Sequence, residues 1–219
     1  MDYLFIEGKY NEKFNLKNLD VKILPKRLAL FTTIQYIDYL DEIKEELKKQ
    51  GIDGILINTN QKYKSQIVGC SINNYEKYDI DGILFIGDGN FHPIALSLKN
   101  NLPIFILNLY NKKILKLDES KIKEIQKQKK IALTKFYSSK NISIIVSIKH
   151  GQYNLDIIER IKKKFPNKNY YILLFDNIEF NQLENFNFTD CFINTACPRI
   201  NYDDFNKFFK PVVYANDLL

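Results

Sequence analysis

The chain carries, at residues 27–33, the stretch Arg27-Leu-Ala-Leu-Phe-Thr-Thr33. This short apolar run predicts a buried strand. Directly after it, Ile37, Leu40, Ile43 and Leu47 recur at helical spacing up to Gly51, which predicts an amphipathic helix. A buried strand followed by such a helix is the repeating unit of a parallel sheet that is covered by helices.

The same alternation continues along the chain. Further strands are expected at 54–58, 82–87, 103–108, 142–147, 170–175, 191–194 and 211–213, and helices at 93–99, 118–140 and 155–165. We therefore predict an α/β fold of two small tandem domains, each with a parallel sheet flanked by helices. Residues 24–117 form the domain that carries Cys70, and residues 118–219 form the domain that carries Cys197. Each cysteine follows an apolar stretch, and the carboxyl edge of such a sheet is where sites are built.

Composition excludes several classes of protein. The chain has 219 residues, of which 45% are hydrophobic, and a formal net charge of +6, so it can bury a core. No apolar run reaches the roughly 18 residues of a membrane span. The acidic residues Asp2 and Glu7 do not fit a signal peptide, which begins with basic and then apolar residues. We expect a cytoplasmic protein without a membrane partner.

The basic excess is almost entirely lysine. Arg27, Arg160 and Arg199 are the three arginines among 32 basic residues, and phosphate and base recognition rely on arginine. This composition favours a solvated lysine surface over direct binding of nucleic acid.

The three cysteines lack the spacing of a disulfide framework or of a zinc knuckle. Cys191 lies inside the predicted strand at 191–194, where a small core side chain is expected. Cys70 and Cys197 follow apolar segments of different domains, and their spacing alone leaves two interpretations open: small buried side chains or ligands.

Two loops could carry further chemistry. The loop Gly87-Asp-Gly-Asn-Phe-His92 has two glycines of a dinucleotide fingerprint but lacks the third, so the pattern is weak. His92 and His150 are the only histidines. The segment Lys149-His-Gly-Gln-Tyr153 lies between a strand and a helix, where free amides suit a carboxylate, although a plain turn has the same pattern.

Five blocks, in this order, resemble the family of archaeal diphthamide synthases, which make aminocarboxypropyl-histidine. The blocks are Leu24-Pro-Lys-Arg-Leu-Ala-Leu-Phe-Thr-Thr-Ile-Gln35, Ser65-Gln-Ile-Val-Gly-Cys70, Phe85-Ile-Gly-Asp-Gly-Asn-Phe-His-Pro93, Ile145-Val-Ser-Ile-Lys-His-Gly-Gln-Tyr153 and Asn194-Thr-Ala-Cys-Pro-Arg-Ile200. The resemblance implies three similar α/β domains that each supply one cysteine to a single [4Fe-4S] cluster. It also implies transfer of the 3-amino-3-carboxypropyl group of S-adenosylmethionine, by radical chemistry, to a histidine of translation elongation factor 2.

The resemblance assigns roles to individual residues of this chain. Cys70 matches the cluster ligand of the second domain and Cys197 that of the third, whereas Cys191 falls in a plain core strand. Gly151 and Gln152 are expected to orient the methionine carboxylate or the incoming histidine. Asp88 and His92 are expected to line the pocket, which makes Gln152 and His92 the catalytic candidates and Gly151, Gln152 and Asp88 the cofactor-binding ones.

The resemblance covers only the second and third domains of the family. Residues 1–23 then correspond to the last strand of a first domain, Tyr3-Leu-Phe-Ile-Glu7, and a linker. We expect a separately encoded partner chain that supplies the third cysteine, an oligomeric complex, and elongation factor 2 as the substrate. Two alternatives stay open: a non-catalytic scaffold or electron-relay subunit of such a complex, and an unrelated α/β module that binds a small molecule.

Overall fold

The computed structural model describes residues 4–219 and divides into two compact units, Met1–Glu119 and Ser120–Leu219. Each unit is an α/β structure. Among the described residues no helix is long and apolar enough to cross a membrane. Leu4–Glu7 form no strand in this chain, and Tyr3, the first residue of the strand predicted there, lies outside the described residues.

The first unit is built on one five-stranded sheet with the order β2-β1-β3-β4-β5. The first four strands run parallel to one another, and β5 is antiparallel to β4, so the predicted parallel sheet is in fact mixed. The elements are β1 (Arg27–Thr32), the 3₁₀ helix η1 (Ile34–Tyr39), α1 (Leu40–Lys49), β2 (Asp53–Leu56), β3 (Gly82–Ile86), α2 (Phe91–Ser97), β4 (Ile104–Asn108) and β5 (Lys113–Lys116).

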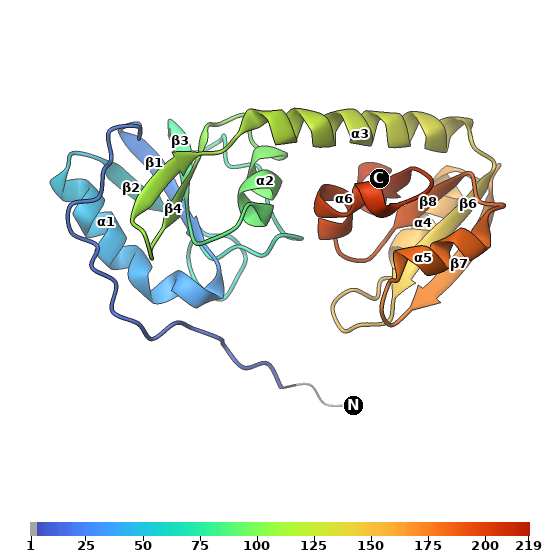
Figure 1. Ribbon diagram of the computed structural model, residues 1–219, viewed down its shortest axis with the longest axis horizontal. Helices are drawn as coiled ribbons and strands as arrows, with labels where there is room; N and C mark the ends of the chain where they lie inside the picture. Colours follow the sequence, from blue (N-terminus) through green and yellow to red (C-terminus); the bar gives the residue numbers. More distant parts are fainter. Residues whose placement is uncertain (1–3) are drawn as a thin grey trace. The chain divides into compact units, whose positions relative to one another are not determined.

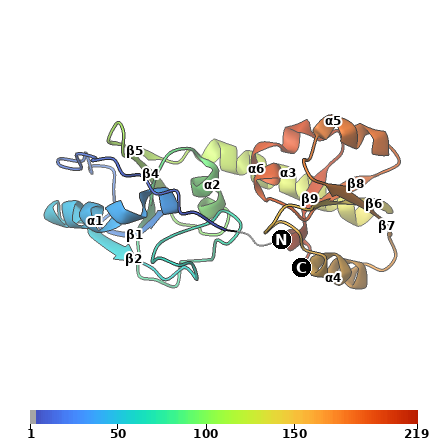
Figure 2. The same cartoon turned by 90° about the horizontal axis from the view of Figure 1, so that it is seen from below.

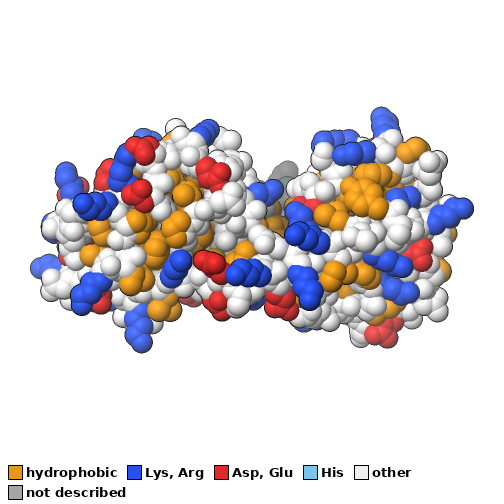
Figure 3. Space-filling model, turned by 90° about the horizontal axis from the view of Figure 1, so that it is seen from above, with side chains coloured by type: hydrophobic (Ala, Val, Ile, Leu, Met, Phe, Trp, Pro, Cys, Tyr) orange, Lys and Arg blue, Asp and Glu red, His pale blue; other side chains and the backbone are white. Residues whose placement is uncertain are grey.

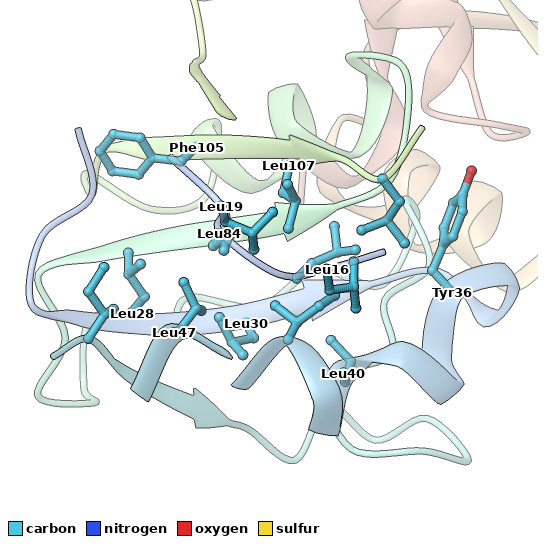
Figure 4. Close-up of a cluster of buried hydrophobic side chains, with 14 of the residues drawn as sticks. Leu16, Leu19, Leu28, Leu30, Tyr36, Leu40, Leu47, Leu84, Phe105 and Leu107 are labelled. Carbon is cyan, nitrogen blue, oxygen red and sulfur yellow. The ribbon is translucent and has the colours of Figure 1, made fainter. Parts of the chain in front are cut away.

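Two apolar layers bury the faces of this sheet. Leu40, Ile43 and Leu47 of α1 pack with Leu28 and Leu30 of β1 on one face (Figure 4). The opposite face carries a second cluster, to which α2 contributes Leu96, and Figure 1 shows α1 and α2 on opposite sides of the sheet. The helical spacing of α1 therefore predicted the core correctly.

The segment before β1 belongs to the same unit. Leu16 and Leu19 are buried in the cluster of α1. The backbone N–H of Asn18 donates to Glu46 Oε1 at 3.0 Å, and Tyr39 Oη donates to the carbonyl oxygen of Glu12 at 2.6 Å. Side chains of η1 and α1 thus hold residues 10–19 against the first unit.

The second unit is a four-stranded parallel sheet with the order β7-β6-β8-β9. Its elements are α3 (Glu119–Ser138), β6 (Asn141–Ser147), α4 (Asp156–Lys164), β7 (Asn169–Phe175), α5 (Phe180–Leu183), η2 (Glu184–Phe186), β8 (Cys191–Asn194), α6 (Arg199–Asp203), η3 (Phe205–Lys207), β9 (Val212–Tyr214) and η4 (Ala215–Asp217). Helices α4 and α5 lie on opposite faces of this sheet (Figure 2), and each covers an apolar cluster.

The two sheets share one topology. In each unit the first strand has a neighbour on both sides. The second strand pairs with one side of it, and the third and fourth strands follow on the other side. The direction in which successive strands are added to the sheet therefore reverses between β1 and β3 in the first unit, and between β6 and β8 in the second. Crevices for ligands form at the carboxyl ends of the strands at such a switch point.

Charged side chains of both signs lie on one face of the molecule. On the face drawn in Figure 3, Lys and Arg side chains are scattered and interspersed with Asp and Glu.

Candidate metal and cofactor site

Cys70 lies beyond the carboxyl end of β1. The segment before Cys70 pairs with the end of this strand through one isolated bridge between Thr32 and Gln66. Ile67 N also donates to Thr32 O at 2.8 Å. Ser71 N then donates to Val68 O at 2.9 Å and closes a turn that leaves Cys70 exposed. The structure thus places Cys70 on an exposed loop at the carboxyl edge of the first sheet.

This placement corrects one expectation. The two cysteines were predicted in similar settings, each just after an apolar strand. In the structure Cys70 lies in the long connection between β2 and β3 and follows only an isolated bridge, whereas Cys197 follows the third strand of its unit, β8. The apolar residues at 67–70 are too few to extend the sheet, because the chain turns at Val68.

The loop of Cys70 contacts the start of α2. A Cβ atom on Gly69 would overlap the ring of Phe91, so the absence of a side chain lets this ring approach the backbone next to Cys70. His92 follows Phe91 and stacks on Phe85 of β3, with the ring centroids 5.6 Å apart. The structure therefore brings Cys70 and His92 to one region of the first unit.

Asp88 lies at the carboxyl end of β3, on an exposed loop between two glycines of positive φ, Gly87 (+151°) and Gly89 (+74°). Backbone of this kind is strained for other residues. Tyr36 Oη donates to Asp88 Oδ1 at 3.3 Å, and Figure 4 shows the Tyr36 hydroxyl pointing away from the apolar cluster. Burial and the nearby Asp88 raise the pKa of Tyr36, which keeps the hydroxyl protonated as a donor.

Cys197 lies at the corresponding edge of the second sheet, three residues after the end of β8, and is half-buried. The side chain of Asn194 fixes its loop: Asn194 Nδ2 donates to Cys197 O at 2.9 Å, and Ala196 N donates to Asn194 Oδ1 at 2.9 Å. Ile200 N also donates to Cys197 O, at 3.2 Å. The backbone around this thiol is therefore held at several points.

Gly151 and Gln152 lie in the loop after β6, the strand next to β8. Gln152 N donates to Lys149 O at 3.0 Å, and Gly151 adopts a positive φ of +77°. Gly151 is exposed and Gln152 is half-buried. Because β6 and β8 are neighbours in a parallel sheet, this turn and the Cys197 loop emerge at the same edge.

Cys191 has a different environment. Its side chain is fully buried among the apolar residues that α4 covers. Burial raises the pKa of the Cys191 thiol to about 12. Since the thiolate is the form that ligates metals, this environment disfavours Cys191 as a ligand.

The donor set fits part of an iron–sulfur cluster. Iron–sulfur clusters are held mainly by cysteine thiolates. Each unit offers one cysteine on a loop at the carboxyl edge of its sheet, and no group of three or more His, Cys, Asp or Glu suited to a metal ion occurs among residues 4–219. Each unit therefore offers one thiol of the kind that ligates iron–sulfur clusters, and neither unit forms a complete site among the described residues.

Several contacts at these loops were not predicted from the sequence. Neither the role of Asn194, nor the packing of Phe91 on Gly69, nor the Tyr36–Asp88 hydrogen bond follows from a motif. The one available signal was a polar residue, Asn194, at the end of the apolar run 191–194.

Comparison with solved structures finds the same architecture. The crystal structure of Dph2 from Pyrococcus horikoshii with a 4Fe-4S cluster superimposes with a TM-score of 0.74 at 29% sequence identity, and the match covers 90% of this chain and 57% of that one.

Sequence comparison identifies curated relatives. The 2-(3-amino-3-carboxypropyl)histidine synthase of Pyrococcus horikoshii is 29% identical over 91% of this chain, and that of Methanocaldococcus jannaschii is 31% identical over 92%. Subunit 1 of the corresponding enzyme of Saccharomyces cerevisiae is 25% identical over 96% of this chain. The chain spans 58%, 62% and 51% of these three relatives.

The sequence profile of diphthamide synthesis proteins matches residues 1–218, nearly the whole chain. The fold, the order of the five blocks and this match agree. The chain belongs to the diphthamide synthesis protein family.

Proposed function

We propose that this chain is a catalytic subunit of an enzyme that transfers the 3-amino-3-carboxypropyl group of S-adenosylmethionine to a histidine of translation elongation factor 2. Its relatives of known name are 2-(3-amino-3-carboxypropyl)histidine synthases. The observation that carries the proposal is the contrast among the cysteines: Cys70 is exposed and Cys197 half-buried, both on loops at the carboxyl edges of the sheets, whereas Cys191 is buried in the core.

In this proposal Cys70 and Cys197 are ligands of one [4Fe-4S] cluster. When bound, such a cluster supplies the electron that breaks the carbon–sulfur bond of S-adenosylmethionine. The role of this chain is to hold its two thiolates in place and to bind and orient the substrate, because the radical chemistry belongs to the cofactor.

The loop residues provide groups of suitable chemistry for the substrate. The backbone amides of the turn at Gly151 and Gln152 suit the carboxylate of the methionine moiety. Asp88, which accepts a hydrogen bond from Tyr36, suits its ammonium group. His92, stacked on Phe85, would line the substrate pocket on the side of the first unit.

The third thiolate comes, in this proposal, from a separately encoded chain that also completes the oligomer. One observation supports it: the described residues gather no three-ligand group, so a cluster held by three cysteines needs a thiolate from elsewhere. The apolar side chains of Leu4 and Ile6, 87% and 85% exposed, would pack on that partner.

The test uses the complex purified anaerobically from cells that also express the native partners. Cys70→Ala and Cys197→Ala should each abolish modification of elongation factor 2 and lower the iron content together. Cys191→Ala is the matched control and should retain both. If Cys70→Ala and Cys197→Ala leave iron content and modification unchanged, this chain is a scaffold or electron-relay subunit.

A further inference from the structure

Strand β8 ends in a buried polar side chain. Asn194 is 0% exposed and follows Cys191, Phe192 and Ile193, which are equally buried. Burying a carboxamide in an apolar core is unfavourable unless its hydrogen bonds are formed. The hydrogen-bond partners of the Asn194 side chain therefore indicate its structural role.

The side chain of Asn194 forms hydrogen bonds to the loop that carries Cys197 and to the helix after it. Oδ1 accepts from Ala196 N at 2.9 Å, and Nδ2 donates to Cys197 O at 2.9 Å and to Asn201 Oδ1 at 2.6 Å. Asn201 Nδ2 in turn donates to Val212 O of β9 at 3.2 Å. The amide thus ties the cysteine loop to two neighbouring strands, β8 and β9.

The first unit provides an internal comparison. Its strand β3 has the same place in the sheet order as β8, and the loop after β3 carries no cysteine. The last residue of β3 is Ile86, which is fully buried. A polar side chain at this position of the fold is therefore not needed to end the strand, and it occurs where the following loop carries a cysteine.

We infer that Asn194 is a positioning residue for Cys197: its carboxamide holds the 195–198 loop in the conformation that presents the thiol. This inference rests on the proposed role of Cys197 as a ligand. Asn194 is buried beneath the loop and acts through it, so it supplies no ligand itself.

The first test measures the thiol in the full chain, without any metal. Alkylation of Cys197 by iodoacetamide is followed by mass spectrometry, with Cys70 of the same molecule as the internal reference. Asn194→Ser should raise the Cys197 rate by up to about tenfold and leave the Cys70 rate unchanged. The half-buried thiol reacts faster when the loop opens, and losing hydrogen bonds worth about 1.4 kcal/mol opens the loop tenfold more often.

Ser143→Ala is the matched control. Ser143 is equally buried in the same sheet and bonds to Thr189 Oγ1, away from the Cys197 loop. This variant should lower the melting temperature without changing the alkylation of Cys197. If Asn194→Ser does not fold, the milder Asn201→Ala replaces it, since it removes an acceptor of Asn194 Nδ2 at a half-buried position.

The second test measures the cluster in the anaerobic complex. Asn194→Ser should lower the iron content, speed the loss of iron to a chelator, and shift the electron paramagnetic resonance spectrum of the reduced complex. Unchanged alkylation and an unchanged spectrum in a folded variant would overturn the inference. If Cys197→Ala itself leaves the iron content unchanged, the proposed ligand role fails, whereas the alkylation test still decides whether Asn194 holds the loop.

Discussion

The ring of Phe91 lies against the backbone of Gly69, the residue that precedes Cys70. This contact joins the first turn of α2 to the loop that carries the proposed ligand, so the position of the loop depends on the space that glycine leaves.

We expect Gly69→Ala to displace either Phe91 or the loop. Such overpacking should cost about 1–3 kcal/mol of unfolding free energy and raise the alkylation rate of Cys70 relative to Cys197. Gly8→Ala is the control, because nothing lies within 4 Å of a Cβ atom there. The double variant Gly69→Ala/Phe91→Leu should recover most of the loss. No recovery would mean that the ring is not the cause.

Lys168 caps the carboxyl end of α3. Its Nζ donates to the carbonyl oxygens of Phe136 and Ser139, both at 2.6 Å, and of Tyr137 at 3.2 Å. Lys168→Met should lower the unfolding free energy by about 1–2 kcal/mol, because these helix-end carbonyls lose a charged donor. Urea unfolding measures the loss, and Lys127→Met on the exposed face of α3 should change little. Equal effects in the two variants would refute the capping role.

The stability of the second unit should depend on pH through Asp190. Backbone N–H groups of Asn141 and Lys140, at 2.9 and 3.2 Å from Oδ2, hold the pKa of Asp190 below its ordinary value of 3.8. Because the pKa is lower in the folded chain, this stabilisation is present above the unfolded pKa and is lost as the pH falls through the folded one. Asp190→Asn should therefore flatten the decline in unfolding free energy between about pH 5 and pH 3. An equally steep decline in this variant would contradict the assignment.

Cys191→Ala should affect stability and not iron. Removing a buried sulfur from a filled core resembles the removal of one methylene group and should cost about 1 kcal/mol. Thermal unfolding measures the cost, and iron analysis of the anaerobic complex should give the wild-type value. A loss of iron equal to that of Cys197→Ala would make Cys191 a ligand.

The strands that are buried along nearly their whole length could be predicted from the sequence. The runs that became β1, β3, β6 and β8 are buried along nearly their whole length, so a continuous apolar pattern marks them. Strand β5, Lys113–Lys116, was missed because it is exposed or half-buried throughout and exists by pairing with β4. Helix α2 was expected to open at Pro93 and begins two residues earlier, at Phe91, since a proline is tolerated throughout the first turn of a helix.

The sequence predicted which residues belong to the candidate site, but not how the fold arranges them. Motif order identified the two loop cysteines, and apolar context predicted correctly that Cys191 is a core residue. The different places of Cys70 and Cys197 in the sheet topology, and the hydrogen bonds of Asn194, depend on contacts between segments distant in the chain. A local pattern does not encode such contacts.

The most direct test of the central claim is the iron and sulfide content of the complex, purified under strict anaerobiosis with its native partners and with every co-purifying chain identified. We expect about four iron atoms and four sulfides per complex, lost on Cys70→Ala or Cys197→Ala, together with a second chain that contributes a cysteine. A complex that keeps its full iron content when both cysteines are replaced would contradict it.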